Sequence, residues 1–201
     1  MARFDDLAAW PAVRTSKSAV RELLVEKGLL TEEQIRREVE DMRARTPERG
    51  ARVVARAWID PDFRRKLLEN GTKACEELGL DVPALKLLVV ENTPQVHNVI
   101  VCTLCSCYPR MLLGIPPDWY KSRAYRSRMV REPREVLKEF GLIVPLETQV
   151  RVHDSTADMR YLVLPMRPAG TGGWDEERLA ALVTRDSMIG VSLPKSPGKN
   201  A

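Results

Sequence analysis

Apolar residues recur at helical spacing through the first third of the chain. The spacing predicts helices over residues 16–27, 31–46, 53–58, 61–70 and 72–78. Thr31 and Gln34 have the spacing of a capping box, and Asp60 precedes a proline at the first helical position. The helices up to about residue 45 have narrow apolar stripes and charged backs. Such stripes suit an arm held by a partner, which we favour, or the outer layer of the domain.

The pattern changes after residue 80, where short apolar runs of strand length begin. Strands are predicted over 85–90, 99–101, 150–154 and 160–164, and a final strand over 188–193. Helical spacing returns over 118–131, 133–140 and 174–183, and prolines and glycines predict loops at 112–117 and 171–173. Helices therefore gather early and strands late, which favours an α+β fold.

Composition and charge narrow the function. A chain of 201 residues is long enough for one domain with an added arm. The net charge is only +4, and the basic residues are interleaved with acidic ones, so no basic patch for nucleic acid is expected. Aromatic residues make up 5%, which leaves few side chains on which bases could stack. No run of eighteen apolar residues and no secretory leader is found, so we expect a cytoplasmic protein that does not enter a membrane.

The cysteines give the first chemical signal. Three of the four lie close together, at Cys102, Cys105 and Cys107. Clustered cysteines indicate a metal or redox site, whereas a disulfide framework would spread them along the chain. A zinc or iron–sulfur site would ordinarily need a fourth ligand at comparable spacing, and only His97 and His153 are available as histidines.

The Cys105-Ser106-Cys107 spacing suits a different metal geometry. Two thiolates and the backbone nitrogens of Ser106 and Cys107 can close three fused chelate rings in one plane, with Cys102 as an axial ligand. One position then stays open, as in catalytic metal sites. Deprotonated amides and thiolates favour a trivalent, low-spin cobalt or iron over zinc.

The segment 101–109 resembles the metal-binding motif of the nitrile hydratase α-subunit. The resemblance extends over residues 15–193 and includes the blocks at 91–94, 113–121, 125–131, 160–165, 167–171 and 182–191. It implies an N-terminal helical arm followed by a layered α-β-β-α metal-binding domain. It also implies hydration of a small-molecule nitrile to the amide, a β-subunit or separate β and γ chains as partners, and an activator protein that inserts cobalt.

The resemblance also implies roles for the motif residues. Cys102 is expected as a thiolate, Cys105 as a sulfinate and Cys107 as a sulfenate, with amide ligands at Ser106 and Cys107. Thr103 is typical of cobalt members, so one Co(III) per chain is expected rather than iron. The catalytic residues implied are Cys107 and Cys105. The metal would act as a Lewis acid on the nitrile nitrogen or activate a bound hydroxide, or the sulfenate oxygen of Cys107 would attack the nitrile carbon. Both routes stay open.

The chain departs from the family after the motif, where Arg110 follows Pro109 in place of a tryptophan. Arg110 and Tyr108 are therefore candidate substrate-pocket residues. One interpretation is that the chain belongs to a divergent branch of the family that hydrates the cyano-heterocycle toyocamycin. The γ-subunit of thiocyanate hydrolase shares the same cysteine spacing and is an alternative. A non-catalytic zinc-binding module is a second alternative, from a different class of protein.

The remaining candidates have structural interpretations. Cys75 is expected as a buried apolar residue and His97 and His153 as structural hydrogen-bonding groups, whereas Asp154 either helps to hold the site or ends a strand. Tyr120 and Lys121 either reach the site from the loop at Pro116 and Pro117 or begin a solvated helix, and the solvated helix start is favoured. The predicted organisation is an arm over 1–75 that contacts the partner, a catalytic metal domain over 76–193, and a disordered tail over 194–201.

Overall fold

The computed structural model describes residues 11–80, 82, 86–104 and 107–198, with side chains from residue 18 onward. The chain divides into two compact units, residues 1–43 and residues 44–201, which are described separately. Among the described residues, no helix is both long and apolar enough to cross a membrane.

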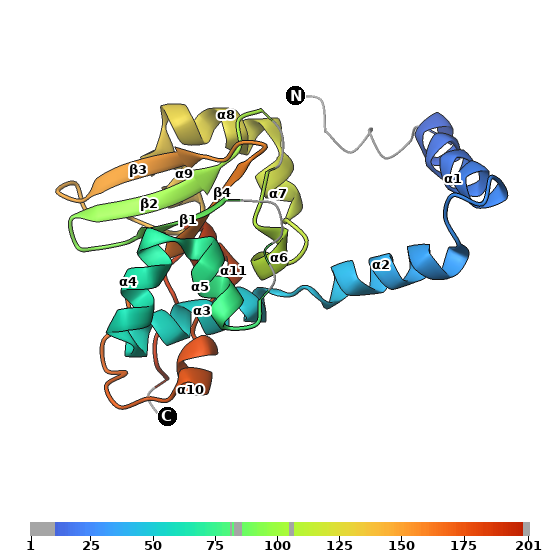
Figure 1. Cartoon of the computed structure of the whole chain (residues 1–201). Coiled ribbons are helices and arrows are strands. Elements are labelled where there is room, and N and C mark those ends of the chain that lie inside the picture. The colour runs from blue at the N-terminus through green and yellow to red at the C-terminus, as the bar shows by residue number, and fades with distance from the viewer. Residues whose placement is uncertain (1–10, 81, 83–85, 105–106, 199–201) are drawn as a thin grey trace. The chain divides into compact units, whose positions relative to one another are not determined.

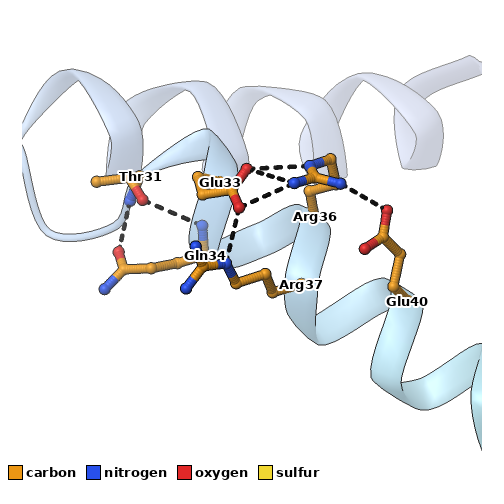
Figure 2. A network of polar contacts seen from close by, with 6 residues as sticks. All are labelled: Thr31, Glu33, Gln34, Arg36, Arg37 and Glu40. Carbon is orange, nitrogen blue, oxygen red and sulfur yellow. Dashed lines mark hydrogen bonds and ion pairs between the residues drawn. The ribbon is translucent and has the colours of Figure 1, made fainter.

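The first unit contains α1 (Pro11–Glu26) and most of α2 (Glu32–Ala44). The predicted capping box is confirmed: the Gln34 backbone N–H donates to Thr31 Oγ1 at 3.1 Å, and the Thr31 N–H donates to Gln34 Oε1 at 2.7 Å. Along the helix, Arg36 forms ion pairs with Glu33 and Glu40 (Figure 2). No residue of α2 is buried, so this helix gains its local stability from caps and charge pairs rather than from packing.

The second unit holds the rest of the secondary structure (Figure 1). Its helices are α3 (Pro47–Ile59), α4 (Pro61–Glu69), α5 (Gly71–Glu77), α6 (Arg110–Leu113), α7 (Asp118–Lys121), α8 (Arg123–Arg131), α9 (Pro133–Glu139), α10 (Glu176–Ala180) and α11 (Arg185–Ile189). Its strands are β1 (Lys86–Glu91), β2 (Val96–Val101), β3 (Gln149–Asp154) and β4 (Met159–Leu164).

The strands form two parallel pairs, β1 with β4 and β2 with β3. Helices α4 and α5 pack on β1, α11 packs on β4, and α9 packs on β3, so helices cover both outer sides of the two strand pairs (Figure 1). The core between these layers is apolar and includes fully buried Leu87, Ile100 and Leu162. The expected α+β class and its α-β-β-α layering are confirmed.

The structure places the boundary of the first unit earlier than the sequence predicts. Helices α3, α4 and α5 all begin before residue 76, yet they contribute Val53, Leu67 and Cys75 to the buried core of the second unit. Helix α3 alone buries six residues, whereas α2 buries none.

The predicted final strand over 188–193 is wrong. Residues 185–189 form α11, which Thr184 caps by accepting the Ser187 backbone N–H at 3.1 Å. Gly190 ends the helix in the left-handed conformation. The predicted helix over 118–131 is also divided, at Ser122, into α7 and α8.

Candidate metal site

The cysteine motif begins where β2 ends. Val101 is the last residue of β2 and pairs with Asp154 at the end of β3, so both strands deliver their carboxyl ends to the same edge. Cys102 is fully buried, and Cys107 is half-buried. Cys105 and Ser106 lie outside the described residues, so the predicted planar claw stays a prediction.

The first turn of the motif is fixed to the neighbouring strand. Asp154 accepts the backbone N–H of Thr103 at 2.9 Å through one carboxylate oxygen and the Thr103 hydroxyl through the other. The Ser155 backbone N–H donates to the Val101 carbonyl at 2.8 Å. Asp154 therefore holds the motif, which decides between the two interpretations that the sequence allowed for it.

A tyrosine hydroxyl holds the last cysteine. Tyr120 Oη donates to the Cys107 carbonyl oxygen at 2.9 Å, and the side chain is fully buried. The interpretation of Tyr120 as part of a solvated helix start is therefore wrong, although it holds for Lys121, which forms an ion pair with Asp118 at 2.7 Å. Burial raises the pKa of Tyr120 far above its ordinary value, and negative charge on Cys102 raises that pKa further, so the phenol stays a donor.

Aromatic packing fixes the orientation of this phenol. The Tyr120 ring lies edge-on to Tyr108 with ring centres 5.1 Å apart, and the ring centre of Tyr125 lies 5.6 Å from that of Tyr120. Trp119 packs on Tyr125 at 4.8 Å and on Phe140 at 4.7 Å. Packed aromatic rings have preferred orientations relative to one another, so these contacts restrict rotation of the Tyr120 and Tyr125 side chains and hold their hydroxyl groups in place.

The two predicted substrate-pocket residues have different surroundings. Tyr108 is 3% exposed, and its ring packs against Tyr120, so its position supports the motif and offers almost no surface to a substrate. Arg110 begins α6 and is exposed, and its role at a pocket stays a prediction.

An open pocket of about 730 Å³ lies beside the first turn of the motif. The motif contributes Thr103 and Leu104 to the lining of the pocket. Helix α8 contributes the rest of the lining: Arg123, Arg126, Ser127, Val130 and Arg131. Arg126 donates to the Thr103 carbonyl oxygen at 3.3 Å, and the Leu104 side chain is 85% exposed. The sequence analysis missed these arginines, although their spacing along one helix was the available signal.

The two histidines belong to a polar network away from the motif. His97 Nε2 donates to the Gly190 carbonyl oxygen at 2.7 Å, and His153 Nε2 donates to Asn98 Oδ1 at 2.8 Å. The Asn98 amide nitrogen is engaged by the Glu91 carbonyl oxygen at 2.7 Å, which leaves its oxygen as the acceptor. Burial lowers the pKa of both histidines, so both are neutral structural groups, as predicted.

The fourth cysteine is also structural. Cys75 is fully buried on α5, and burial raises the pKa of its thiol to about 12. A thiol with so high a pKa is inert toward metals and oxidants at neutral pH, which confirms its interpretation as an apolar core residue.

The donor groups that the structure describes fit a thiolate metal site. Cys102 is buried at the end of β2, and the Cys107 carbonyl oxygen accepts a hydrogen bond from Tyr120, so both described cysteines of the motif have fixed surroundings. Among the described residues, no three His, Cys, Asp or Glu side chains are grouped closely enough to hold a metal ion, and Cys105 lies outside those residues. The low-spin trivalent ion expected from the sequence depends on the backbone-nitrogen ligands as well as on sulfur, and it stays a prediction.

Comparison with known proteins identifies the family. The family model for the nitrile hydratase alpha chain matches residues 12–192 of this sequence. The chain belongs to the nitrile hydratase α-chain family. Within this family, the cobalt-containing nitrile hydratase subunit alpha of Pseudonocardia thermophila is 52% identical over 181 residues, covering 89% of each chain.

Further relatives include both enzymes considered from the sequence. The low-molecular-weight cobalt-containing nitrile hydratase subunit alpha of Rhodococcus rhodochrous is 50% identical over 90% of this chain and 88% of its own. The thiocyanate hydrolase subunit gamma of Thiobacillus thioparus is 46% identical over 90% of this chain and 79% of its own.

A solved structure confirms the fold. An iron-type nitrile hydratase from Comamonas testosteroni superimposes with a TM-score of 0.87 and 47% sequence identity over 94% of each chain. Nitrile hydratases are enzymes that hydrate nitriles, and their α-chains work with a β-chain. This chain is therefore an enzyme subunit, and the alternative of a non-catalytic zinc-binding module is wrong.

Proposed function

We propose that this chain is the metal-bearing catalytic subunit of a cobalt nitrile hydratase. Cys102, Cys105 and Cys107 would hold one Co(III) with the backbone nitrogens of Ser106 and Cys107, and the substrate is a small-molecule nitrile. The single observation that carries the proposal is the cysteine motif, set at the carboxyl ends of β2 and β3, in a chain about half identical to cobalt-containing relatives. When bound, the ion would supply Lewis acidity toward a nitrile.

The protein groups around the motif have separate tasks in this proposal. Asp154 orients Thr103 at the start of the motif, and Tyr120 orients Cys107 at its end. Burial of Cys102 keeps water from one thiolate, and the exposed side of the motif at Leu104 leaves access for a substrate and a partner chain. Oxidation of Cys105 to sulfinate and Cys107 to sulfenate completes the proposed site.

Iron is the competing metal, because an iron-type enzyme shares the fold. Thr103 favours cobalt through the resemblance described above, and the Pseudonocardia and Rhodococcus relatives are cobalt proteins by name. We propose that cobalt enters as Co(II) with an activator protein and is then oxidised, because low-spin Co(III) exchanges ligands too slowly for direct insertion. We also propose a cytoplasmic location, where the cysteines would be reduced thiols before the metal binds and they are oxidised.

Hydrolysis of thiocyanate is the second candidate function. It is favoured by the 46% identity to a thiocyanate hydrolase subunit and by the arginine-lined pocket beside the motif, which suits an anion. The identity to nitrile hydratase α-chains is higher, at 50% and 52%, and we therefore rank nitrile hydration first.

One experiment separates the two functions. The chain is co-produced with its β-chain and an activator protein in cobalt medium, and the complex is assayed with an aliphatic nitrile, an aromatic nitrile and thiocyanate. We expect amide formation from at least one nitrile and little thiocyanate turnover, and almost no activity from the chain alone. Preferential thiocyanate turnover would favour the second function, and full nitrile turnover by the isolated chain would refute the need for a partner.

A further inference from the structure

Two tyrosine hydroxyls contact backbone carbonyls on the two sides of the cysteine motif. Tyr125 Oη donates to the Ile100 carbonyl oxygen at 2.8 Å, two residues before Cys102. Tyr120 Oη donates to the Cys107 carbonyl oxygen at 2.9 Å, at the last cysteine. Both phenols are buried, so each bond is shielded from competing water.

Both tyrosines come from one rigid corner of the chain. Tyr120 lies on α7 and Tyr125 lies on α8, and Ser122 joins the two helices. The Ser122 hydroxyl donates to the Trp119 carbonyl at 2.8 Å and accepts the Tyr125 backbone N–H at 3.1 Å. The spacing between the two phenols is therefore fixed by local hydrogen bonds and by the contact between their rings.

The corner is itself anchored in the core. Trp119 packs on both Tyr125 and Phe140, and Phe140 is the C-cap of α9. Because α9 packs on β3, these ring contacts hold the α7–α8 corner against the helix that covers β3. Motion of the motif away from this corner would break a buried hydrogen bond at either end, and a buried polar group without a partner is costly.

We propose that Tyr120 and Tyr125 are positioning residues that clamp the backbone on the two sides of the cysteine motif, at Ile100 and at Cys107, without help from the metal. Each bond of the clamp joins two protein groups, so it can form in the apo chain. Only the expected effects on cobalt binding and activity rest on the proposed function. Its structural part concerns the backbone at Ile100 and at Cys107.

The first test uses the full chain purified without cobalt. Tyr120→Phe removes one hydroxyl and keeps the ring, and Tyr161→Phe is the matched control because Tyr161 lies on β4 with its ring against His153. We expect faster amide hydrogen exchange in the peptide that follows Cys107 for Tyr120→Phe and unchanged exchange for Tyr161→Phe. Equal exchange in the wild type and both variants would overturn the clamp.

The second test measures the metal in the complex with the β-chain. Removal of a group that orients a metal ligand commonly costs about ten- to a hundredfold in metal affinity or activity. We therefore expect Tyr120→Phe to weaken cobalt retention against a chelator by about tenfold or more, to shift the sulfur-to-cobalt absorption band, and to lower kcat more than it raises KM. Unchanged cobalt retention and an unchanged band would contradict the proposal.

Tyr125→Phe keeps the inference testable if Tyr120→Phe fails to fold. The inference then expects faster exchange at residues 100–103 and weaker cobalt retention, because the clamp has lost its other end. Wild-type behaviour of Tyr125→Phe in both measurements would overturn it. Failure of the proposed function looks different, since the wild-type complex itself would then hold no cobalt or hydrate no nitrile.

Discussion

The Asp154 carboxylate accepts both the backbone N–H and the hydroxyl of Thr103. The two residues are far apart in sequence and meet because β2 and β3 pair in parallel register, with Val101 opposite Asp154. One carboxylate thereby sets both the backbone and the side-chain direction of the residue that follows the first cysteine.

Asp154→Asn should weaken the metal site more than it weakens the fold. An amide can accept only one of the two hydrogen bonds well, and the pair is exposed, so the cost in unfolding free energy should be about 1 kcal/mol or less. Cobalt occupancy and kcat should fall by about tenfold. The control is Asp158→Asn, which changes an exposed acid four residues later and should leave both values intact. Equal behaviour of the two variants would contradict the role of Asp154.

Cys107→Ala should abolish cobalt binding and activity together, since a thiolate donor and a chelate ring are lost. Cobalt analysis of the purified complex checks this expectation. Cys75→Ala is the control, because Cys75 is buried in the core and should cost about 1 kcal/mol of unfolding free energy without loss of cobalt. Substantial nitrile hydration by Cys107→Ala would exclude the proposed ligand set.

The sequence predicted the elements that have strong local signals. Thr31 with Gln34 and Asp60 with Pro61 mark helix starts by side-chain chemistry, and the structure has both caps. The apolar runs at 85–90 and 160–164 also correspond to β1 and β4. The last element was misjudged because the apolar residues of 188–193 outweighed a nearby cap, the Thr184–Ser187 pair, which starts α11.

The site was predictable only in part. The cysteine spacing was enough to predict a set of metal ligands, because chelate chemistry depends on residues adjacent in sequence. The contacts from Tyr120 to Cys107 and from Asp154 to Thr103 depend on how separate elements pack, and single residues carry no local sign of them. Burial of Tyr120 likewise results from the aromatic cluster around it, which only the tertiary structure assembles.

Gly190→Ala should destabilise the chain strongly. Gly190 has a φ of +92°, and a Cβ there would lie 2.1 Å from the Asn98 carbonyl oxygen on β2. The left-handed strain and the clash with backbone should together cost about 3 kcal/mol. Gly172→Ala, where a Cβ meets nothing within 4 Å, should change the unfolding free energy by about 0.5 kcal/mol or less. Urea unfolding of both variants checks the difference, and equal midpoints would contradict it.

Stability should fall as the pH drops below the ordinary histidine pKa of 6.5. The folded pKa values of His97 and His153 are lowered by burial, so the unfolded chain binds protons that the folded chain does not. Their contribution is complete above pH 6.5 and is lost as the pH falls through that value toward the folded pKa values. These are the only two histidines in the sequence, so urea unfolding of untagged protein at pH 7.5 and 5.5 isolates them. We expect a loss of about 1 kcal/mol, and no loss would contradict the sign.

The central claim is tested most directly by the state of one peptide in the purified complex. Trypsin releases residues 87–110, which contain all three clustered cysteines. We expect one cobalt per chain by metal analysis. By mass spectrometry we expect a peptide with Cys102 unmodified, Cys105 as sulfinate and Cys107 as sulfenate. Zinc in place of cobalt, with three unmodified thiols in a complex that hydrates no nitrile, would contradict it.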